Sequence, residues 1–152
     1  MGRRLALCKV KELADYIKIL RHHPTELDAL HQDLLINVTS FFRNPSMFEA
    51  LKKKIFPKLV RNLSGADSLR IWVAGCSTGQ EAYSIAMAYA EFVEKADDSV
   101  PIQIFASDVN GAVLETARAG CYSKADVSMV GSARLQKFFT LEEGRYRVNK
   151  SI

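Results

Sequence analysis

The sequence predicts an α/β protein in which a helical N-terminal segment precedes a parallel sheet and a short β-hairpin. Three observations support this prediction. Apolar residues recur at helical spacing through the first ~65 residues. Two β-branched runs then alternate with two helix-like segments, which is the order of a parallel sheet built by right-handed crossovers. The stretch FFTLEEGRYRV has the alternation of a hairpin that turns near Glu142-Glu143-Gly144.

Three helices are expected in the N-terminal segment. The first spans residues 10–20 and ends before a His-His-Pro sequence, because the residue before proline avoids the α region. Thr25 is the expected N-cap of the second helix. The third spans residues 47–63, and Pro57 is expected to kink or end it because proline has no backbone N–H to donate.

In the second half of the chain the apolar pattern changes from helical to strand-like. Strands are predicted at residues 69–75 (LRIWVAG) and 100–108 (VPIQIFASD), which are rich in β-branched and aromatic side chains. Helices are predicted after them, at residues 80–95 and 111–120, and a glycine closes the second helix.

The stretch SGADS, at residues 64–68, predicts a linker between these two parts. We therefore expect a helical subdomain over residues 1–65 and a second domain over residues 66–152. Residues 1–61 hold 12 Lys/Arg and 6 Asp/Glu, a net charge of +6, whereas the rest of the chain carries −2. The basic segment can steer toward an acidic partner, either nucleic acid or protein. The alternative is that its charges, such as those of the lysines at 52–54, only solvate helix faces.

Composition is that of an ordinary folded domain, with 48% hydrophobic and 25% charged residues in 152. No apolar run approaches the ~20 residues that span a bilayer, and the basic N-terminus lacks the apolar stretch of a signal peptide. The three cysteines are odd in number and show no CxxC spacing. This pattern predicts reduced thiols in the cytoplasm and argues against a disulfide framework or a zinc site.

The turn between the first strand and its helix, residues 74–79 (AGCSTG), is the candidate site. Small residues there let a ligand approach the backbone, and free amides at the helix start can hydrogen-bond it. Asp108 ends the neighbouring strand, where such folds bind ribose hydroxyls. The turn is not a GxGxxG fingerprint, so a tight packing turn in an unrelated α/β domain is the alternative. Cys76 is interpreted as a packing residue, because no activating base is placed beside it.

Four stretches then resemble a known family in order and spacing: INVTSFFRNPSMFEAL, IWVAGCSTGQEAYSIAM, IFASDVNGAVLETARAGCYS and LQKFFT…GRYRV. The chain resembles the CheR-type chemotaxis receptor methyltransferases over nearly its whole length. The resemblance implies a partial Rossmann-like sheet that binds S-adenosylmethionine. It also implies protein-glutamate O-methyltransferase activity on cytoplasmic helices of methyl-accepting chemotaxis receptors, with the basic N-terminal subdomain docking on the receptor.

The resemblance also implies roles for individual residues. Ala74 would lie against the cofactor, and Asp108 would bind its ribose. Gln80 would meet the amino end of the cofactor's methionine part. Many relatives carry glutamate at this position, so the glutamine gives up a charge partner for the cofactor's ammonium group. Arg43 would also be catalytic by holding the substrate carboxylate, although a structural ion pair is its alternative role. The residues implied to line the cofactor pocket are Asn37, Thr39, Arg43, Ala74, Gln80 and Asp108.

The family's domain continues past the hairpin into a strand with an Arg-Asn motif, whereas this chain stops at Ile152. We therefore expect a truncated pocket, impaired catalysis and an open sheet edge that can pair in a homodimer. A non-catalytic cofactor-sensing or protein-docking module of a multidomain signalling protein is an alternative. A nucleic-acid methyltransferase is a further alternative, suggested by the pI of ≈ 9.0. No basic stripe interleaved with aromatic residues supports that last reading. The adjacent pair Phe41 and Phe42 is expected to pack in the core.

Overall fold

The protein is described by a computed structural model that covers residues 2–35, 38–63, 68–96 and 100–152. The chain forms two compact units, Met1–Ile36 and Asn37–Ile152, which are described separately here. Among the described residues, no helix has the length and apolar character needed to cross a lipid bilayer. The three cysteines are free thiols.

The described residues of the first unit, 2–35, form three helices, α1 (Gly2–Leu7), α2 (Leu13–His22) and α3 (Pro24–Leu34). The predicted first helix is found as α2. The second begins at Pro24, so Thr25 lies inside the helix and is not its N-cap. Proline suits a first helical position because its φ is already helical and its missing N–H would have no partner there. Helix α1 was not predicted.

One hydrogen-bonded cluster joins the three helices of this unit. Glu26 of α3 accepts a bond from Arg4 Nε of α1 at 2.9 Å and one from the Tyr16 hydroxyl of α2 at 2.7 Å. Tyr16 is fully buried. The hydrogen bonds from Arg4 and Tyr16 lower the pKa of Glu26 to about 2. The Glu26 carboxylate therefore links all three short helices through hydrogen bonds.

The second unit opens with a helical stretch that contains a π-helical turn. Helix α4 (Pro45–Ala50) runs into η1 (Leu51–Ile55), a π-helix, and then into α5 (Phe56–Arg61). The N–H of Phe56 donates to the carbonyl of Leu51, five residues back. Pro57 therefore does not end the helix. The wider turn precedes it, in a region where proline could not have supplied a regular helical hydrogen bond.

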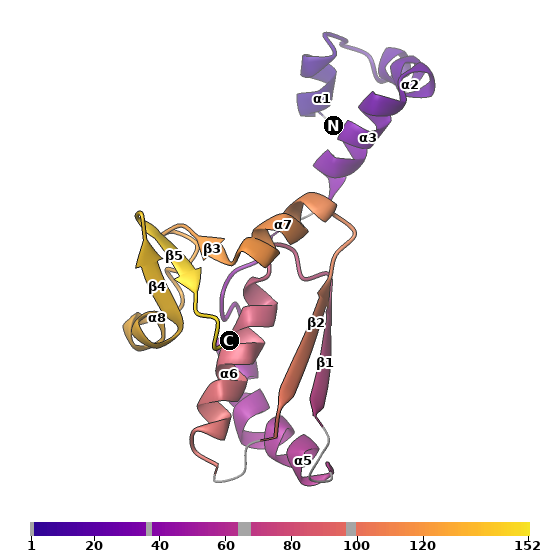
Figure 1. Ribbon diagram of the computed structural model, residues 1–152. Helices are drawn as coiled ribbons and strands as arrows, with labels where there is room; N and C mark the ends of the chain where they lie inside the picture. The colour runs from indigo at the N-terminus through magenta and orange to yellow at the C-terminus, as the bar shows by residue number, and fades with distance from the viewer. Residues whose placement is uncertain (1, 36–37, 64–67, 97–99) are drawn as a thin grey trace. The chain divides into compact units, whose positions relative to one another are not determined.

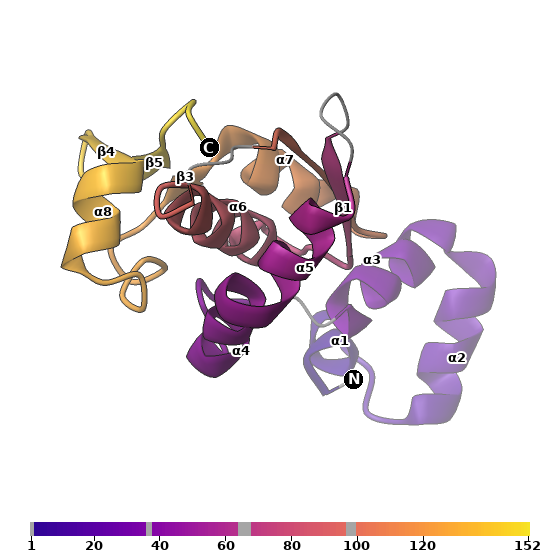
Figure 2. The ribbon, with the colours of Figure 1, turned by 90° about the horizontal axis from the view of Figure 1, so that it is seen from below.

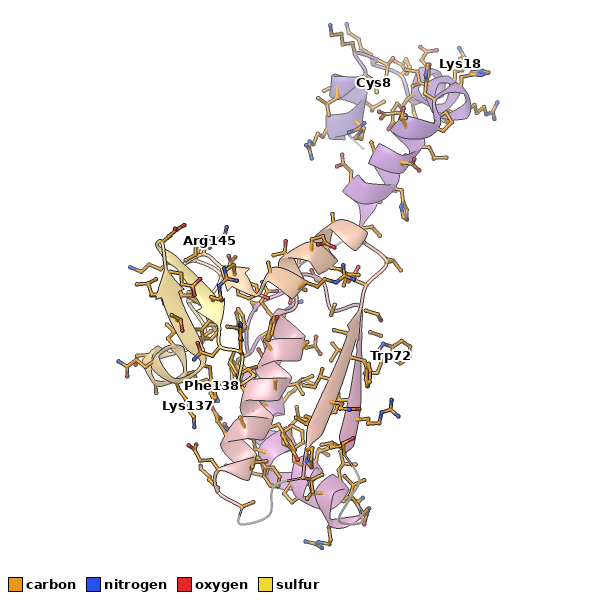
Figure 3. All side chains as sticks on the ribbon, viewed as in Figure 1. Cys8, Lys18, Trp72, Lys137, Phe138 and Arg145 are labelled. Atoms are coloured by element: carbon orange, nitrogen blue, oxygen red, sulfur yellow. The ribbon has the colours of Figure 1, made fainter. Side chains whose placement is uncertain are left out.

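Two parallel strands form the first sheet, as predicted. β1 (Leu69–Ala74) and β2 (Ile102–Ser107) pair in register from Leu69 with Ile102 to Ala74 with Ser107. Helix α6 (Gln80–Val93) connects them, and α7 (Gly111–Ala119) follows β2 (Figure 1). Both helices match the predicted ones closely. We call the opposite side of the sheet the bare face because, among the described residues of this unit, Trp72 is 72% and Phe105 49% exposed there. Trp72 points away from α6 (Figure 3).

The predicted hairpin is also present and belongs to a second sheet. β4 (Phe139–Glu142) and β5 (Arg145–Val148) pair antiparallel, and the turn residues Glu143 and Gly144 both have positive φ. The short strand β3 (Cys121–Tyr122) pairs on the other side of β5, and α8 (Ser132–Phe138) precedes the hairpin. Neither β3 nor α8 was predicted.

The helices α4, η1 and α5 belong to the same unit as the sheet. Figure 2 shows them alongside α6, with which α4 and η1 make contact. The compact units therefore divide at residue 36, whereas the sequence predicted a subdomain boundary at 65. Aromatic side chains join this helical stretch to α6: the rings of Phe56 and Tyr89 meet edge-on, with centroids 5.2 Å apart. The largest buried side chains of the unit are Phe41, Phe42, Phe56, Met87 and Tyr122.

Candidate functional site

The turn between β1 and α6 contains two glycines with different surroundings. Gly75 has a φ of 69°, and no atom lies within 4 Å of the position that a Cβ would take. Gly79 has a φ of 94°, and a Cβ there would lie 2.9 Å from the Cβ of Ala117. Gly79 therefore allows α6 and α7 to pack closely, whereas Gly75 leaves the backbone open for approach from outside.

Asp108 is held beside this turn by backbone amides. Its Oδ2 accepts a hydrogen bond of 2.8 Å from the N–H of Ser77, and its Oδ1 accepts one of 2.8 Å from Asn110. Ala74 is paired with Ser107, the residue before Asp108. The carboxylate is half-buried, and each of its oxygens keeps a lone pair for a further donor. The structure thus brings the turn and this acidic residue together, as expected.

Gln80 is the first residue of α6 and is buried. Its side-chain Oε1 accepts a bond of 2.7 Å from the hydroxyl of Thr78. Its main-chain carbonyl accepts one of 2.6 Å from the hydroxyl of Ser84, a turn further along α6. The side-chain amide group therefore remains to donate hydrogen bonds to other groups.

Residues 38–43 form a closed loop at the start of the second unit. Arg43 is exposed, and its Nη1 donates to the carbonyl of Val38 at 3.1 Å. Within the described ranges, no carboxylate lies at ion-pair distance from Arg43, so the structural ion pair considered above is not observed. Thr39 is half-buried in the loop. Asn37 lies outside the described residues.

Phe41 and Phe42, the next residues of the loop, are core residues as predicted, with exposed fractions of 0% and 2%. The ring of Phe41 meets that of Tyr122 edge-on, with centroids 4.9 Å apart. The backbone N–H of Phe42 donates a bond of 3.0 Å to the hydroxyl of Ser84. Ser84 thereby links this loop to α6, and the sequence analysis missed it. Its only signal was a serine four residues after Gln80 in an otherwise apolar stretch.

A cluster of charged side chains, Arg134, Glu91 and Lys52, lies beside the Phe42 ring. The guanidinium of Arg134, on α8, lies 3.9 Å from the centre of the Phe42 ring. Arg134 binds Glu91 through two bonds, of 2.5 and 3.0 Å, and Lys52 approaches the same carboxylate at 2.8 Å. The hydrogen bonds from Arg134 and Lys52 lower the pKa of Glu91 to about 2. No sequence pattern indicated this cluster, because its members lie on three separate helical segments.

Cys76 has the properties of a packing residue. It is 1% exposed, and burial, together with the nearby charge of Asp108, raises the pKa of its thiol. An apolar groove of about 280 Å³ runs between α6, β2 and α7, and Cys76 and Gly79 are the turn residues that line it. In the described part of the chain, no three His, Cys, Asp or Glu side chains are placed to hold a metal ion.

The comparison with protein families decides what this arrangement belongs to. The family model described as "CheR methyltransferase, SAM binding domain" matches residues 37–152. These residues make up most of the chain and coincide with the second compact unit. The chain belongs to the CheR methyltransferase family. Its cofactor is S-adenosylmethionine, and the resemblance seen in the sequence is confirmed.

Individual relatives agree with this assignment. The "Chemotaxis protein methyltransferase 2" of Vibrio cholerae is 33% identical over 99% of this chain and 52% of its own length. The "Chemotaxis protein methyltransferase" of Escherichia coli is 33% identical over 99% of this chain and 51% of its own length. An "Uncharacterized 104.1 kDa protein in hypE 3'region" of Rhodobacter capsulatus is 38% identical over 99% of this chain but only 16% of its own. The chain thus spans about half the length of these chemotaxis methyltransferases.

Proposed function

We propose that the protein is an S-adenosylmethionine-dependent O-methyltransferase that acts on glutamate side chains of chemotaxis receptors in bacterial-type chemotaxis signalling. The family and the printed names of the relatives support the methyltransferase and the chemotaxis parts of this proposal. The observation that carries it is the hydrogen bond of 2.8 Å between the Ser77 amide and Asp108, because it fixes a carboxylate beside an open glycine turn.

The residues of this edge suit S-adenosylmethionine. Ala74 and Gly75 are small and exposed, so an adenosine ring can lie against them. The free lone pairs of Asp108 suit the two ribose hydroxyls, which are donors. The Gln80 amide suits the methionine end of the cofactor, although it offers hydrogen bonds in place of a charge. In this proposal Asn37 and Thr39 complete the pocket, within a Rossmann-like domain.

Arg43 is proposed to hold the carboxylate of the substrate glutamate. Its guanidinium is exposed, uses one donor on the Val38 carbonyl and keeps others for a two-pronged bond to a carboxylate. A glutamate side chain with a reference pKa of ~4.3 is already ionised at neutral pH, so the site needs no strong general base. S-adenosylmethionine supplies the methyl group when bound. The task of the protein side chains is to align the carboxylate and keep it dry.

The proposed partner is a cytoplasmic helix of a methyl-accepting chemotaxis receptor. Residues 1–61 carry a net charge of +6, which favours association with an acidic surface. We place the reaction in the cytoplasm, in agreement with the free thiols.

Methyl transfer to an isolated receptor signalling domain tests the proposal. Arg43→Ala should reduce transfer at saturating cofactor while leaving the affinity for S-adenosylhomocysteine within severalfold of the parent value. Arg70→Ala is the matched control, because Arg70 is also exposed but stacks on Phe105 on the bare face of the sheet. Unchanged transfer by Arg43→Ala would remove its proposed role, and methyl groups found on residues other than glutamate would overturn the substrate assignment.

The second candidate function is a non-catalytic cofactor-sensing or protein-docking module. The state of Gln80 favours this candidate. Its side-chain oxygen already accepts a hydrogen bond from Thr78, and the side chain carries no charge to pair with the ammonium group of the cofactor. Such a module would bind S-adenosylhomocysteine, measured by calorimetry, and would transfer no methyl group to any receptor domain.

A further inference from the structure

Phe42 has a backbone conformation that its side chain does not favour. Its φ is 49°, in the left-handed region, which is uncommon for bulky residues. Such a conformation persists only where the surroundings hold it in place, and it is concentrated at functional sites. Phe42 directly precedes Arg43, so this conformation determines the direction in which the chain enters Arg43.

The surroundings of Phe42 hold it at three points. Its ring meets Phe48 edge-on, with centroids 5.0 Å apart, and the Arg134 guanidinium lies 3.9 Å from the ring centre. Glu91 fixes that guanidinium through two hydrogen bonds. The third point is the Phe42 backbone N–H, which donates to the hydroxyl of Ser84 at 3.0 Å.

Ser84 does more than satisfy this amide. Its side chain is fully buried, and its hydroxyl donates at 2.6 Å to the carbonyl of Gln80 while it accepts from Phe42. One hydroxyl therefore connects the loop that carries Arg43 to the helix start that carries Gln80. Phe42 and Ser84 lie 42 positions apart in the sequence, and the hydroxyl fixes the distance between the backbones of the two segments.

We propose that Ser84 is a positioning residue for the methyltransferase site, acting through Phe42 to hold Arg43 and through the Gln80 carbonyl to hold the first turn of α6. The proposal rests on the function proposed above for Arg43 and Gln80. Removing the hydroxyl leaves a buried amide without a partner and releases the loop from the helix.

Calorimetry with S-adenosylhomocysteine gives the first test. Ser84→Ala should weaken binding by about tenfold, because the loss of an internal bond to a buried amide is of the size that changes an equilibrium tenfold. Tyr89→Phe is the matched control. It also removes one hydroxyl hydrogen bond from α6, the 2.6 Å bond to the Val100 carbonyl, but at the end of the helix away from the turn. Equal losses of affinity in the two variants would reduce Ser84 to a structural residue.

A double-mutant cycle with Arg43 distinguishes a positioning role of Ser84 from a purely structural one. If Ser84 acts through Arg43, Ser84→Ala should change the rate of methyl transfer at saturating cofactor by less than about threefold in an Arg43→Ala background. Additive effects of the two substitutions would overturn the proposal.

Hydrogen exchange separates failure of this proposal from failure of the proposed function. In Ser84→Ala the amides of residues 39–43 should exchange at least about tenfold faster than in the parent, relative to the amides of α6, and in Tyr89→Phe they should not. If the parent chain fails to bind S-adenosylhomocysteine, the proposed function fails, and the exchange rates still decide whether Ser84 holds the loop. Unchanged protection of residues 39–43 would overturn the positioning role.

Discussion

The backbone N–H of Ser77 donates a hydrogen bond of 2.8 Å to Oδ2 of Asp108, thirty-one residues further along the chain. Ser77 has a positive φ of 50°, so the turn is bent in a way that presents this amide to the carboxylate. The bond joins the ends of the two parallel strands at the edge where such sheets bind ligands. Both the stability of the turn and its affinity for the cofactor should depend on it.

Asp108→Asn tests this dependence. One side-chain position that now accepts an amide bond would become an NH₂ group facing another donor, and the charge offered to the ribose would be lost. We expect a loss of about 1 to 3 kcal/mol in the free energy of unfolding and about 10- to 100-fold weaker binding of S-adenosylhomocysteine, because each effect is roughly the value of one or two hydrogen bonds to a charged group. Urea denaturation and calorimetry measure the two effects.

Asp126→Asn is the control for that experiment. Asp126 also accepts a 2.8 Å bond from a backbone amide, that of Ser123, in an exposed turn near the second sheet. Its substitution should cost less stability and leave the affinity unchanged. A similar loss of affinity in the two variants would argue against a direct contact between Asp108 and the cofactor.

The two glycines of the turn should respond differently to alanine. Gly79→Ala brings a methyl group to 2.9 Å from the Ala117 side chain at an unfavourable φ, so it should destabilise by about 2 to 4 kcal/mol. Gly75→Ala meets no atom and should cost only about 1 to 2 kcal/mol of backbone strain. It should nevertheless weaken S-adenosylhomocysteine binding more, relative to its effect on stability. Thermal unfolding and calorimetry check the order, and the reverse order would contradict the assignment of Gly75 to the ligand side.

Glu91 should make stability depend on pH at the acidic end. Its pKa is about 2 in the folded protein because Arg134 and Lys52 bind it, below the ~4.3 of an unfolded chain. The stabilisation is therefore fully present above the unfolded pKa and is lost as the pH falls through 4.3 toward about 2. Glu91→Gln should cost about 1 to 3 kcal/mol near neutral pH and almost nothing at the lowest pH at which the protein folds.

Glu94→Gln is the matched control for Glu91. Glu94 lies on the same helical segment and pairs with Lys137, but its side chain is 63% exposed. Because exposed pairs contribute little, this variant should stay within about 0.5 kcal/mol of the parent at every pH. Denaturant titrations over the acidic range compare the two variants with the parent. A constant difference between Glu91→Gln and the parent across that range would show that the ion pair is not the source.

Local patterns were enough to predict much of the second unit. The strands β1 and β2, the helices α6 and α7 and the hairpin all follow from periodicity and turn residues that lie within each element. The candidate turn and Asp108 followed as well, because parallel strands bring their carboxyl ends to one edge. The boundary of the helical segment was harder, since the contacts of α4 and η1 with α6 decide it and no local pattern records them.

The residues that hold the site could not be predicted in the same way. Ser84 meets Phe42 across 42 positions, and Arg134 meets Glu91 across 43. Each of these side chains is unremarkable in its own stretch of sequence and acquires a role only from its partner. The π-helical turn at η1 and the start of α3 at Pro24 likewise depend on how neighbouring turns share their hydrogen bonds.

The bare face of the first sheet gives the protein a built-in optical probe. The chain has one tryptophan, and Trp72 is 72% exposed there, with its indole N–H bonded to Ser107 at 3.0 Å. Any chain segment, second copy or partner that covers this face would shield the indole from a soluble quencher. The self-association predicted from the open sheet edge can therefore be followed by fluorescence at increasing protein concentration, without a label and without altering the cofactor edge.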